Sequence, residues 1–415
     1  MPAPDPIAAD NAATQPWLAI VGIGEDGADG LTPAARRLVE GAEIVFGGKR
    51  HLALAAPLIR GAVRSWPSPF DRAVEEVLAH RGRPVCVLAS GDPFHYGVGS
   101  LLARAVPAHE IVAVPAPSAF SLAAARLGWP LADTVLLSLH GRSLDLIRPH
   151  LHPGARILAL TSDADAPAAL AHLLADSRFG PSRLTVLEAL GGPRERIGSA
   201  EAQGFDLVGI DALNTVAVEV KAGPGASVVP LTPGLPDDVF EHDGQLTKRA
   251  IRAVTLASLA PRRGELLWDI GAGAGSVAIE WMLADPSMRA IAVESVPGRA
   301  ARIARNAATL GVPDLHVIEG RAPAALIGLD PPDAVFVGCG ASDAAILDAA
   351  VAALRAGGRL VVNAVTLESE AALLARHPAE GGDLTRIAIA RAEPLGGQIG
   401  WRPAMPITQW VWVKP

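Results

Sequence analysis

The residues best suited to ligand chemistry lie in a glycine-rich segment in the second half of the chain, from Asp269 to Gly275. The apolar run that begins at Leu266 is typical of a buried strand, and the residues from Ser276 onwards are typical of a helix. Glycines at such a turn let the backbone approach a ligand, and the free N–H groups of the helix start can bind it. The segment therefore predicts a ligand site at the carboxyl end of a strand.

Acidic residues around these glycines indicate the ligand. Asp269 ends the strand, and Glu294 ends the next one, at about the 20-residue offset where a carboxylate grips ribose hydroxyls. A carboxylate at Asp269 would repel a pyrophosphate, and Ser276 stands where a dinucleotide site needs glycine. S-adenosylmethionine instead carries an ammonium and a sulfonium, which a carboxylate attracts. We therefore predict that this cofactor is bound by Asp269, Gly271, Ala272, Gly273, Ala274, Gly275, Glu294, Arg321 and Ala322. A nicotinamide nucleotide site and a turn without any ligand remain alternatives.

Three further turns follow predicted strands in the first half of the chain. They are Val21–Gly24, Gly91–Gly99 and Pro115–Ser118. Each one alone is typical of an ordinary strand-to-helix turn. Their occurrence in this order, at strand ends where α/β sheets bind ligands, favours a second site.

The first half resembles the tetrapyrrole (corrin) methylase family. The matching residues are Val21-Gly22-Ile23-Gly24 with Leu31-Thr32, Gly91-Asp92-Pro93 with Tyr96-Gly97, and Leu187-Glu188-Ala189-Leu190-Gly191. The second half resembles the decarboxylating precorrin methylase domain. The matching residues there are Leu246-Thr247-Lys248, Asp269 to Ser276, Glu294, Gly320-Arg321-Ala322 and Gly397-Gln398-Ile399-Gly400.

This resemblance implies one S-adenosylmethionine for each domain. It adds Gly22, Gly24, Gly91, Asp92, Pro93, Tyr96, Ser118 and Thr247 to the predicted cofactor-binding residues. The order of the two domains is similar to that of the bifunctional methylases of cobalamin synthesis that act on precorrin-6Y. It implies methylation of C5 by the first domain. It also implies C15 methylation with loss of the ring C acetate carboxylate by the second, giving precorrin-8X.

Strand-like and helix-like segments alternate along both halves, which predicts an α/β fold. We expect domains at residues 16–222 and 238–415, joined by a Pro- and Gly-rich linker at 223–237. The resemblance implies a two-lobed tetrapyrrole methylase fold followed by a Rossmann-like class I methyltransferase fold. The residues from Asp383 to Trp412 predict antiparallel terminal strands with a turn at Gly396-Gly397.

Candidates for proton transfer and substrate binding are less specific. Glu241, His242, Asn363 and Gln398 are weak catalytic candidates, although Glu241 and His242 equally suit a helix cap or linker. His95, His140 and Arg142 are candidate substrate contacts in the first domain. The polar stripe of a predicted helix places Lys248, Arg249 and Arg252 on a solvated face, and Cys339 is expected to be a small buried residue. The conjugated macrocycle can take up the electrons of decarboxylation, so no metal is expected.

Composition narrows the classes of partner. A net charge of -7 argues against nucleic acid, and charges and turn residues interrupt every window of about 18 residues, so a membrane span is not expected. Residues 1–16 lack the basic start and apolar stretch of a secretory signal, and the two cysteines are far apart in sequence. We therefore expect a cytoplasmic enzyme that takes a tetrapyrrole polycarboxylate and, by analogy, forms a homo-oligomer. Two alternatives remain open: a two-domain methyltransferase with another substrate, and a non-catalytic scaffold that binds adenosyl nucleotides.

Overall fold

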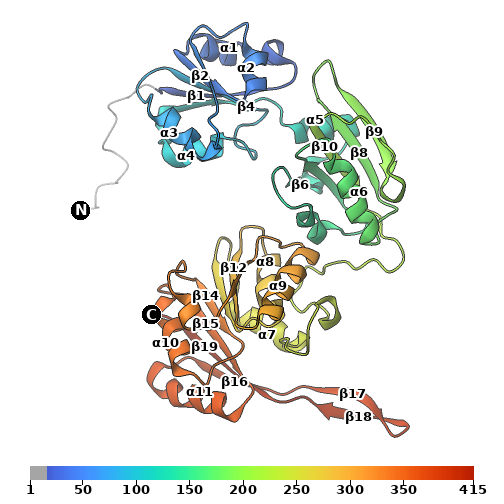
Figure 1. The fold of residues 1–415 in the computed structure, drawn as a ribbon, viewed down its shortest axis with the longest axis vertical. Helices are drawn as coiled ribbons and strands as arrows, with labels where there is room; N and C mark the ends of the chain where they lie inside the picture. The colour runs from blue at the N-terminus through green and yellow to red at the C-terminus, as the bar shows by residue number, and fades with distance from the viewer. Residues whose placement is uncertain (1–15) are drawn as a thin grey trace, which may run out of the picture. The chain divides into compact units, whose positions relative to one another are not determined.

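The computed structural model describes residues 16–415, so all but the last of residues 1–16, considered above as a possible signal sequence, lie outside the described residues. The chain divides into two compact units (Figure 1). The first runs to Arg142 and resumes over His152–Ala226, and the second contains Ser143–Leu151 and Ser227–Pro415. None of the helices in the described part is long and apolar enough to cross a membrane.

The first unit begins with a parallel five-stranded sheet in the order β3-β2-β4-β1-β5. Its strands are β1 (Leu18–Ile23), β2 (Ile44–Gly47), β3 (Ala62–Ser65), β4 (Val85–Ser90) and β5 (Ile111–Val114). Its helices are α1 (Pro33–Glu40), α2 (Lys49–Ala55), α3 (Ala73–Leu78) and α4 (Gly99–Ala105). In β1, Ala19 and Val21 pack into the core that α1 and α2 cover, whereas Leu18 and Ile20 pack toward α3 and α4. Burial on both faces explains why this strand is continuously apolar.

A second, mixed sheet completes this unit in the order β6-β7-β10-β8-β9. It contains β6 (Thr134–Ser138), β7 (Arg156–Leu160), β8 (Arg183–Glu188), β9 (Arg196–Glu201) and β10 (Asn214–Glu219). Only β6 and β7 are parallel, and the other pairs are antiparallel. Helices α5 (Ala119–Leu127) and α6 (Ala166–Asp176) belong to this part of the unit. The two sheets bear out the two-lobed fold.

The second unit contains a seven-stranded sheet in the order β13-β12-β11-β14-β15-β19-β16. Strands β11 (Leu266–Ile270), β12 (Arg289–Glu294), β13 (His316–Glu319), β14 (Ala334–Val337) and β15 (Arg359–Ala364) are parallel. Strand β19 (Ile407–Val413) runs antiparallel to both β15 and β16 (Asp383–Ile387). The predicted Rossmann-like fold with antiparallel terminal strands is confirmed.

Helices cover both faces of this sheet. One core contains side chains of α7 (Arg249–Leu259), α8 (Ser276–Leu283) and α9 (Pro297–Thr309). The other contains side chains of α10 (Ala344–Ala353) and α11 (Leu367–Glu380). Strands β17 (Ala390–Leu395) and β18 (Gln398–Pro403) pair only with each other, and Figure 1 shows this hairpin projecting from the unit. The carboxyl ends of β11, β12 and β14 thus meet at one edge of the sheet, where ligands of such folds bind.

Candidate functional site

The glycine loop of the second unit has a backbone that only glycine adopts easily. Gly271, Gly273 and Gly275 have φ angles of +72°, +61° and +77°. A Cβ atom on Gly273 would lie 2.9 Å from the backbone oxygen of Gln245, and one on Gly275 would lie 2.6 Å from Cγ2 of Ile303. The loop is therefore closely packed on both sides, and its glycines are required by space as well as by torsion.

Glu294 holds this loop in place. Its side chain is buried, and its two carboxylate oxygens accept hydrogen bonds from the backbone nitrogens of Gly273 and Val296, each at 2.9 Å. The neighbouring turn joins the same edge, because the nitrogen of Gly320 donates to the backbone oxygen of Glu294 at 2.9 Å. This turn leads into Arg321, which is exposed, and Ala322, which is buried. Each carboxylate oxygen keeps a further lone pair, so ribose hydroxyls can still bind Glu294.

The side chain of Asp269 has one carboxylate oxygen that accepts no hydrogen bond from the residues described by the structure. The side chain is 1% exposed, and Oδ2 accepts a hydrogen bond from the nitrogen of Ala278 at 3.0 Å. Oδ1 has no hydrogen-bond partner among the described residues. Burial, together with the negative charge of Glu294, raises the pKa of this carboxyl group to about 7. A buried acceptor without a partner needs a ligand donor or cation, so these residues fit the charged end of S-adenosylmethionine.

The prediction that Arg252 lies on a solvated helix face is wrong. Its side chain is completely buried, and Nε lies 2.5 Å from Oε1 of Glu280. The guanidinium also donates to the backbone oxygens of Leu235 and Thr247, while Glu280 accepts from the nitrogens of Gly234 and Leu235. Through these hydrogen bonds, Arg252 of α7 and Glu280 of α8 hold the segment that precedes α7 against both helices. The helix itself begins only at Arg249, and Thr247 lies just before it.

Replacing Arg252 with Met should destabilise the second unit, because it leaves the charge of Glu280 buried without its partner. We expect the free energy of unfolding to fall by about 3–5 kcal/mol, measured as a shift of the urea unfolding transition. Arg263 is the matched control, since its side chain is 85% exposed where it pairs with Asp285. Arg263→Met should barely move the transition, and equal shifts for both variants would contradict this interpretation.

The weak catalytic candidates occupy separate places. Glu241 is exposed and pairs with Arg305 at 2.7 Å, and this interaction lowers the pKa of its carboxyl group. A lowered pKa does not suit a general base at neutral pH. The ring of His242, also exposed, accepts a hydrogen bond from the nitrogen of Gly244 at 3.0 Å. Gln398 begins β18 on the projecting hairpin.

Asn363 and Cys339 lie at the ends of neighbouring strands but differ in burial. Asn363 is buried, donates to Thr255 and accepts from Gln409, both at 2.9 Å, and so joins α7 to β15 and β19. The prediction that Cys339 is buried is wrong, because its side chain is exposed. Cys339 lies between Gly338 and Gly340, just beyond β14. A Cβ atom placed on Gly271 would lie 2.8 Å from the Cβ atom of Cys339, so this residue packs directly against the glycine loop.

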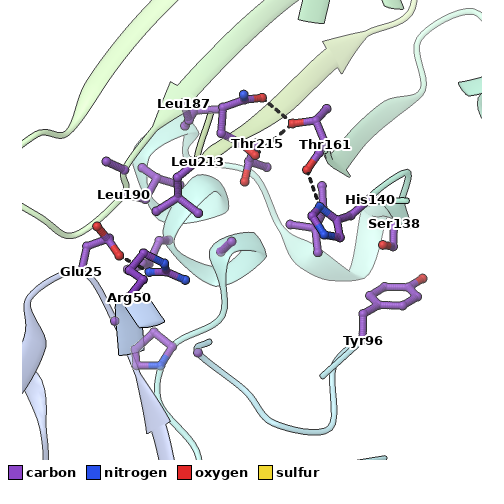
Figure 2. A pocket seen from close by; sticks show the side chains of 18 of the residues that line it. Glu25, Arg50, Tyr96, Ser138, His140, Thr161, Leu187, Leu190, Leu213 and Thr215 are labelled. Atoms are coloured by element: carbon purple, nitrogen blue, oxygen red, sulfur yellow. Dashed lines mark hydrogen bonds and ion pairs between the residues drawn. The ribbon is translucent and has the colours of Figure 1, made fainter. Parts of the chain in front are cut away.

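The first unit contains a cavity of about 360 Å³ at the strand ends of both of its sheets (Figure 2). This volume is within the range of roughly 300–1,000 Å³ typical of small-molecule sites. Of the predicted cofactor-binding residues of this unit, Gly24, Gly91 and Tyr96 line it. The cavity brings together motifs that are far apart in the sequence.

The other predicted residues of this unit shape the loops around the cavity. A Cβ atom on Gly22 would lie 1.9 Å from the backbone oxygen of Gly91, which also accepts a hydrogen bond from Ala116 at 3.1 Å. Ser118 caps α5 by accepting from the nitrogen of Ser121 at 3.1 Å. The backbone oxygen of Pro93 accepts from Gly99, and Asp92 accepts from the nitrogen of Phe94 at 2.8 Å.

Several residues that line the cavity were not predicted from the sequence. Glu25 forms an ion pair with Arg50, and Oε2 of Glu25 also lies 3.5 Å from Arg194. Thr161 directly follows β7, Asn214 is the first residue of β10, and their side chains are hydrogen bonded to each other. Beside Arg50, burial and the positive charge of that residue lower the pKa of His51 to about 4. The sequence feature that could have identified these residues is their position, because Glu25 follows the first glycine motif and Thr161 follows a predicted strand.

Two family models match the chain. Residues 18–204 match the Tetrapyrrole (Corrin/Porphyrin) Methylases, and residues 238–414 match the Precorrin methyltransferase domain. The chain is also 59% identical over 403 residues to a precorrin-6Y C(5,15)-methyltransferase (decarboxylating) from Sinorhizobium sp, which covers 97% of this chain and 98% of that protein.

Two shorter relatives from Salmonella typhimurium each match part of the chain. A cobalt-precorrin-7 C(5)-methyltransferase is 32% identical over 43% of this chain and 88% of its own length. A cobalt-precorrin-6B C(15)-methyltransferase (decarboxylating) is 34% identical over 39% of this chain and 85% of its own length. Through its near full-length relative and its two matching domain models, the chain belongs to the family of decarboxylating precorrin-6Y C5,15-methyltransferases.

Proposed function

We propose that this chain methylates precorrin-6Y at C5 and C15 and removes the carboxyl group of the ring C acetate, giving precorrin-8X. The observation that supports the proposal is that each of the two methylase units contains a candidate ligand site. One is the glycine loop with the buried, unpaired oxygen of Asp269, and the other is the cavity between the strand ends of the first unit. We further propose that each site takes one S-adenosylmethionine.

The two reactions are assigned to the two units on the basis of the relatives. The Salmonella relatives are a C5-methyltransferase and a decarboxylating C15-methyltransferase that occur as separate proteins. We assign C5 methylation to the tetrapyrrole methylase unit, residues 18–204, and the C15 and decarboxylation steps to the precorrin methyltransferase unit, residues 238–414.

The main task of the residues at both candidate sites is to position the cofactor and the substrate for methyl transfer. S-adenosylmethionine supplies an activated methyl group, so its transfer to a carbon nucleophile requires alignment more than acid or base strength. In the second unit the carboxylate of Asp269 would hold the cationic end of the cofactor, and the carboxylate of Glu294 would hold its ribose hydroxyls beside the closely packed glycine loop. The macrocycle accepts the electron pair left by the departing carbon dioxide. The tetrapyrrole carboxylates suit arginine side chains, and Arg50 and Arg142 line the cavity of the first unit.

Calorimetric titration of S-adenosylhomocysteine into the full chain tests the cofactor count. We expect two molecules bound per chain, and one in the Asp269→Ala variant. A single site in the unmodified chain would contradict the proposal. Mass spectrometry of precorrin-6Y incubated with enzyme and S-adenosylmethionine should show a gain of two methyl groups and the loss of carbon dioxide. Binding without turnover would instead favour the non-catalytic scaffold. A homo-oligomer and a cytoplasmic location stay predictions, to be tested by light scattering and cell fractionation.

A further inference from the structure

We propose that His140 is the general base of the first unit, which accepts through Nε2 the proton released when C5 is methylated. The inference rests on the proposed function and adds to it a residue that performs the proton transfer. His140 lines the cavity just beyond the end of β6, and Figure 2 shows its ring beside Ser138 and Thr161.

The orientation of the ring is fixed by a backbone group. Nδ1 of His140 lies 3.0 Å from the backbone oxygen of Thr161, and a carbonyl oxygen can only accept a hydrogen bond. Nδ1 therefore carries the hydrogen, and the neutral ring has its lone pair on Nε2. No hydrogen-bond partner for Nε2 occurs among the described residues, and the side chain is exposed in the wall of the cavity.

The carbonyl that orients His140 is itself held by a buried network. Thr161 is 5% exposed, and its hydroxyl donates to the backbone oxygen of Asn214 at 3.0 Å. The amide of Asn214 donates to the backbone oxygens of Asp163 at 2.8 Å and Asp211 at 2.9 Å. The residues on either side of His140 are also tied to this strand end, through hydrogen bonds from Leu139 to Leu160 and from Gly141 to Ser162, both at 2.8 Å.

The other ionisable side chains in the cavity wall suit the role less well. Glu25 is engaged by Arg50 and Arg194. Tyr96 uses its hydroxyl hydrogen to donate to the backbone oxygen of Leu136 at 3.3 Å. Arg50 and Arg142 carry guanidinium groups, which donate hydrogen bonds and have no lone pair that could accept a proton. His140 is thus the one cavity residue that combines an oriented ring with a lone pair directed at no protein donor in the described part of the chain.

Methylation of C5 breaks one bond to sulfur and one C–H bond, and every electron pair and proton has a destination. The bond between the methyl carbon and the sulfonium sulfur breaks, and its electron pair stays on sulfur, which becomes a neutral thioether. A π electron pair of the macrocycle forms the new bond from C5 to the methyl carbon. C5 then carries both the methyl group and its original hydrogen. His140 Nε2 takes that hydrogen as a proton, the C–H electron pair returns to the macrocycle, and the imidazolium later releases the proton to water.

Replacing His140 with Ala in the full chain tests this role. We expect kcat for C5 methylation to fall by about 100- to 10,000-fold with little change in KM, and added imidazole to restore part of the rate. A substrate deuterated at C5 should show a primary isotope effect in the variant, because proton removal becomes slow. The affinity for S-adenosylhomocysteine should not change. His172→Ala is the matched control, since His172 is an exposed residue of α6 in the same unit.

Two results would overturn the inference while leaving the proposed function intact. One is a His140→Ala chain that methylates C5 at nearly the normal rate. The other is a chain that loses the rate together with S-adenosylhomocysteine affinity and is not rescued by imidazole, which would give His140 a binding role only. In both cases the unmodified chain would still methylate C5. Failure of the unmodified chain to methylate C5 would instead remove the proposed function, and the inference with it.

Discussion

Replacing Asp269 with Ala should abolish the loss of carbon dioxide and the C15 methylation. The substitution removes the buried oxygen that has no partner within residues 16–415, and also the hydrogen bond that Asp269 accepts from Ala278 at the start of α8. The cationic end of the cofactor then loses its counter-charge in a dry site, where an electrostatic interaction is strongest. Mass spectrometry of the product measures the outcome, and a product that still loses carbon dioxide at the normal rate would refute this role.

Asp269→Asn is the matched control because it keeps the shape of the side chain and an acceptor for Ala278. The pKa of Asp269 is about 7 in the folded chain, against 3.8 for an unperturbed group. At a pH between these two values, Asp269 is protonated in the folded chain and ionised in the unfolded chain. The free energy of unfolding should therefore fall as pH rises from about 4 to 7. The Asp269→Asn variant should lack this contribution to the pH dependence of the free energy of unfolding, because asparagine does not ionise. An identical pH dependence in both chains would contradict the assignment.

Replacing Gly22 with Ala should reduce the rate of C5 methylation by about 100-fold or more and leave decarboxylation and C15 methylation in place. The new Cβ atom would lie 1.9 Å from the backbone oxygen of Gly91 and 2.5 Å from the nitrogen of Ala116. Neither backbone group can move away alone, so the end of β1 and the turns after β4 and β5 must shift together. A displacement of about 1 Å in a site that works by alignment can reduce the rate about 100-fold.

Gly204→Ala is the control for this substitution, because a Cβ atom there meets nothing within 4 Å. The product of the Gly22→Ala chain should have lost carbon dioxide and gained one methyl group. Mixing this chain with the Asp269→Ala chain should restore the doubly methylated product, since each supplies the unit that the other lacks. A mixture that stays at the singly methylated stage would contradict the division of the two reactions.

The features that were predictable from the sequence are local ones. The apolar run from Leu266 to Ile270, the glycines after it and the start of α8 at Ser276 follow one another without interruption, so the pattern of neighbours determines the structure. The same holds for β1, in which every residue is buried. Strand-to-helix turns of this kind carry their signal within about ten residues.

The features that could not be predicted depend on contacts between distant segments. Helical periodicity placed Arg252 on a polar stripe, but its partner Glu280 lies on the next helix, and nothing near Arg252 in the sequence indicates that contact. The cavity wall is formed likewise by residues such as Arg50, Thr161 and Asn214, which follow or begin different strands. Only the order of the strands in each sheet brings them together.

The close packing of Gly22 against Gly91 and Ala116 limits how this enzyme can be altered. The three turns that build one wall of the cavity leave no room for side chains between them, so a mutation in any of them disturbs the other two. The opposite wall contains larger side chains, among them Leu160, Leu187 and Leu213. Libraries that aim to change the accepted substrate should therefore vary the loops of the second sheet and keep those of the first as a fixed frame.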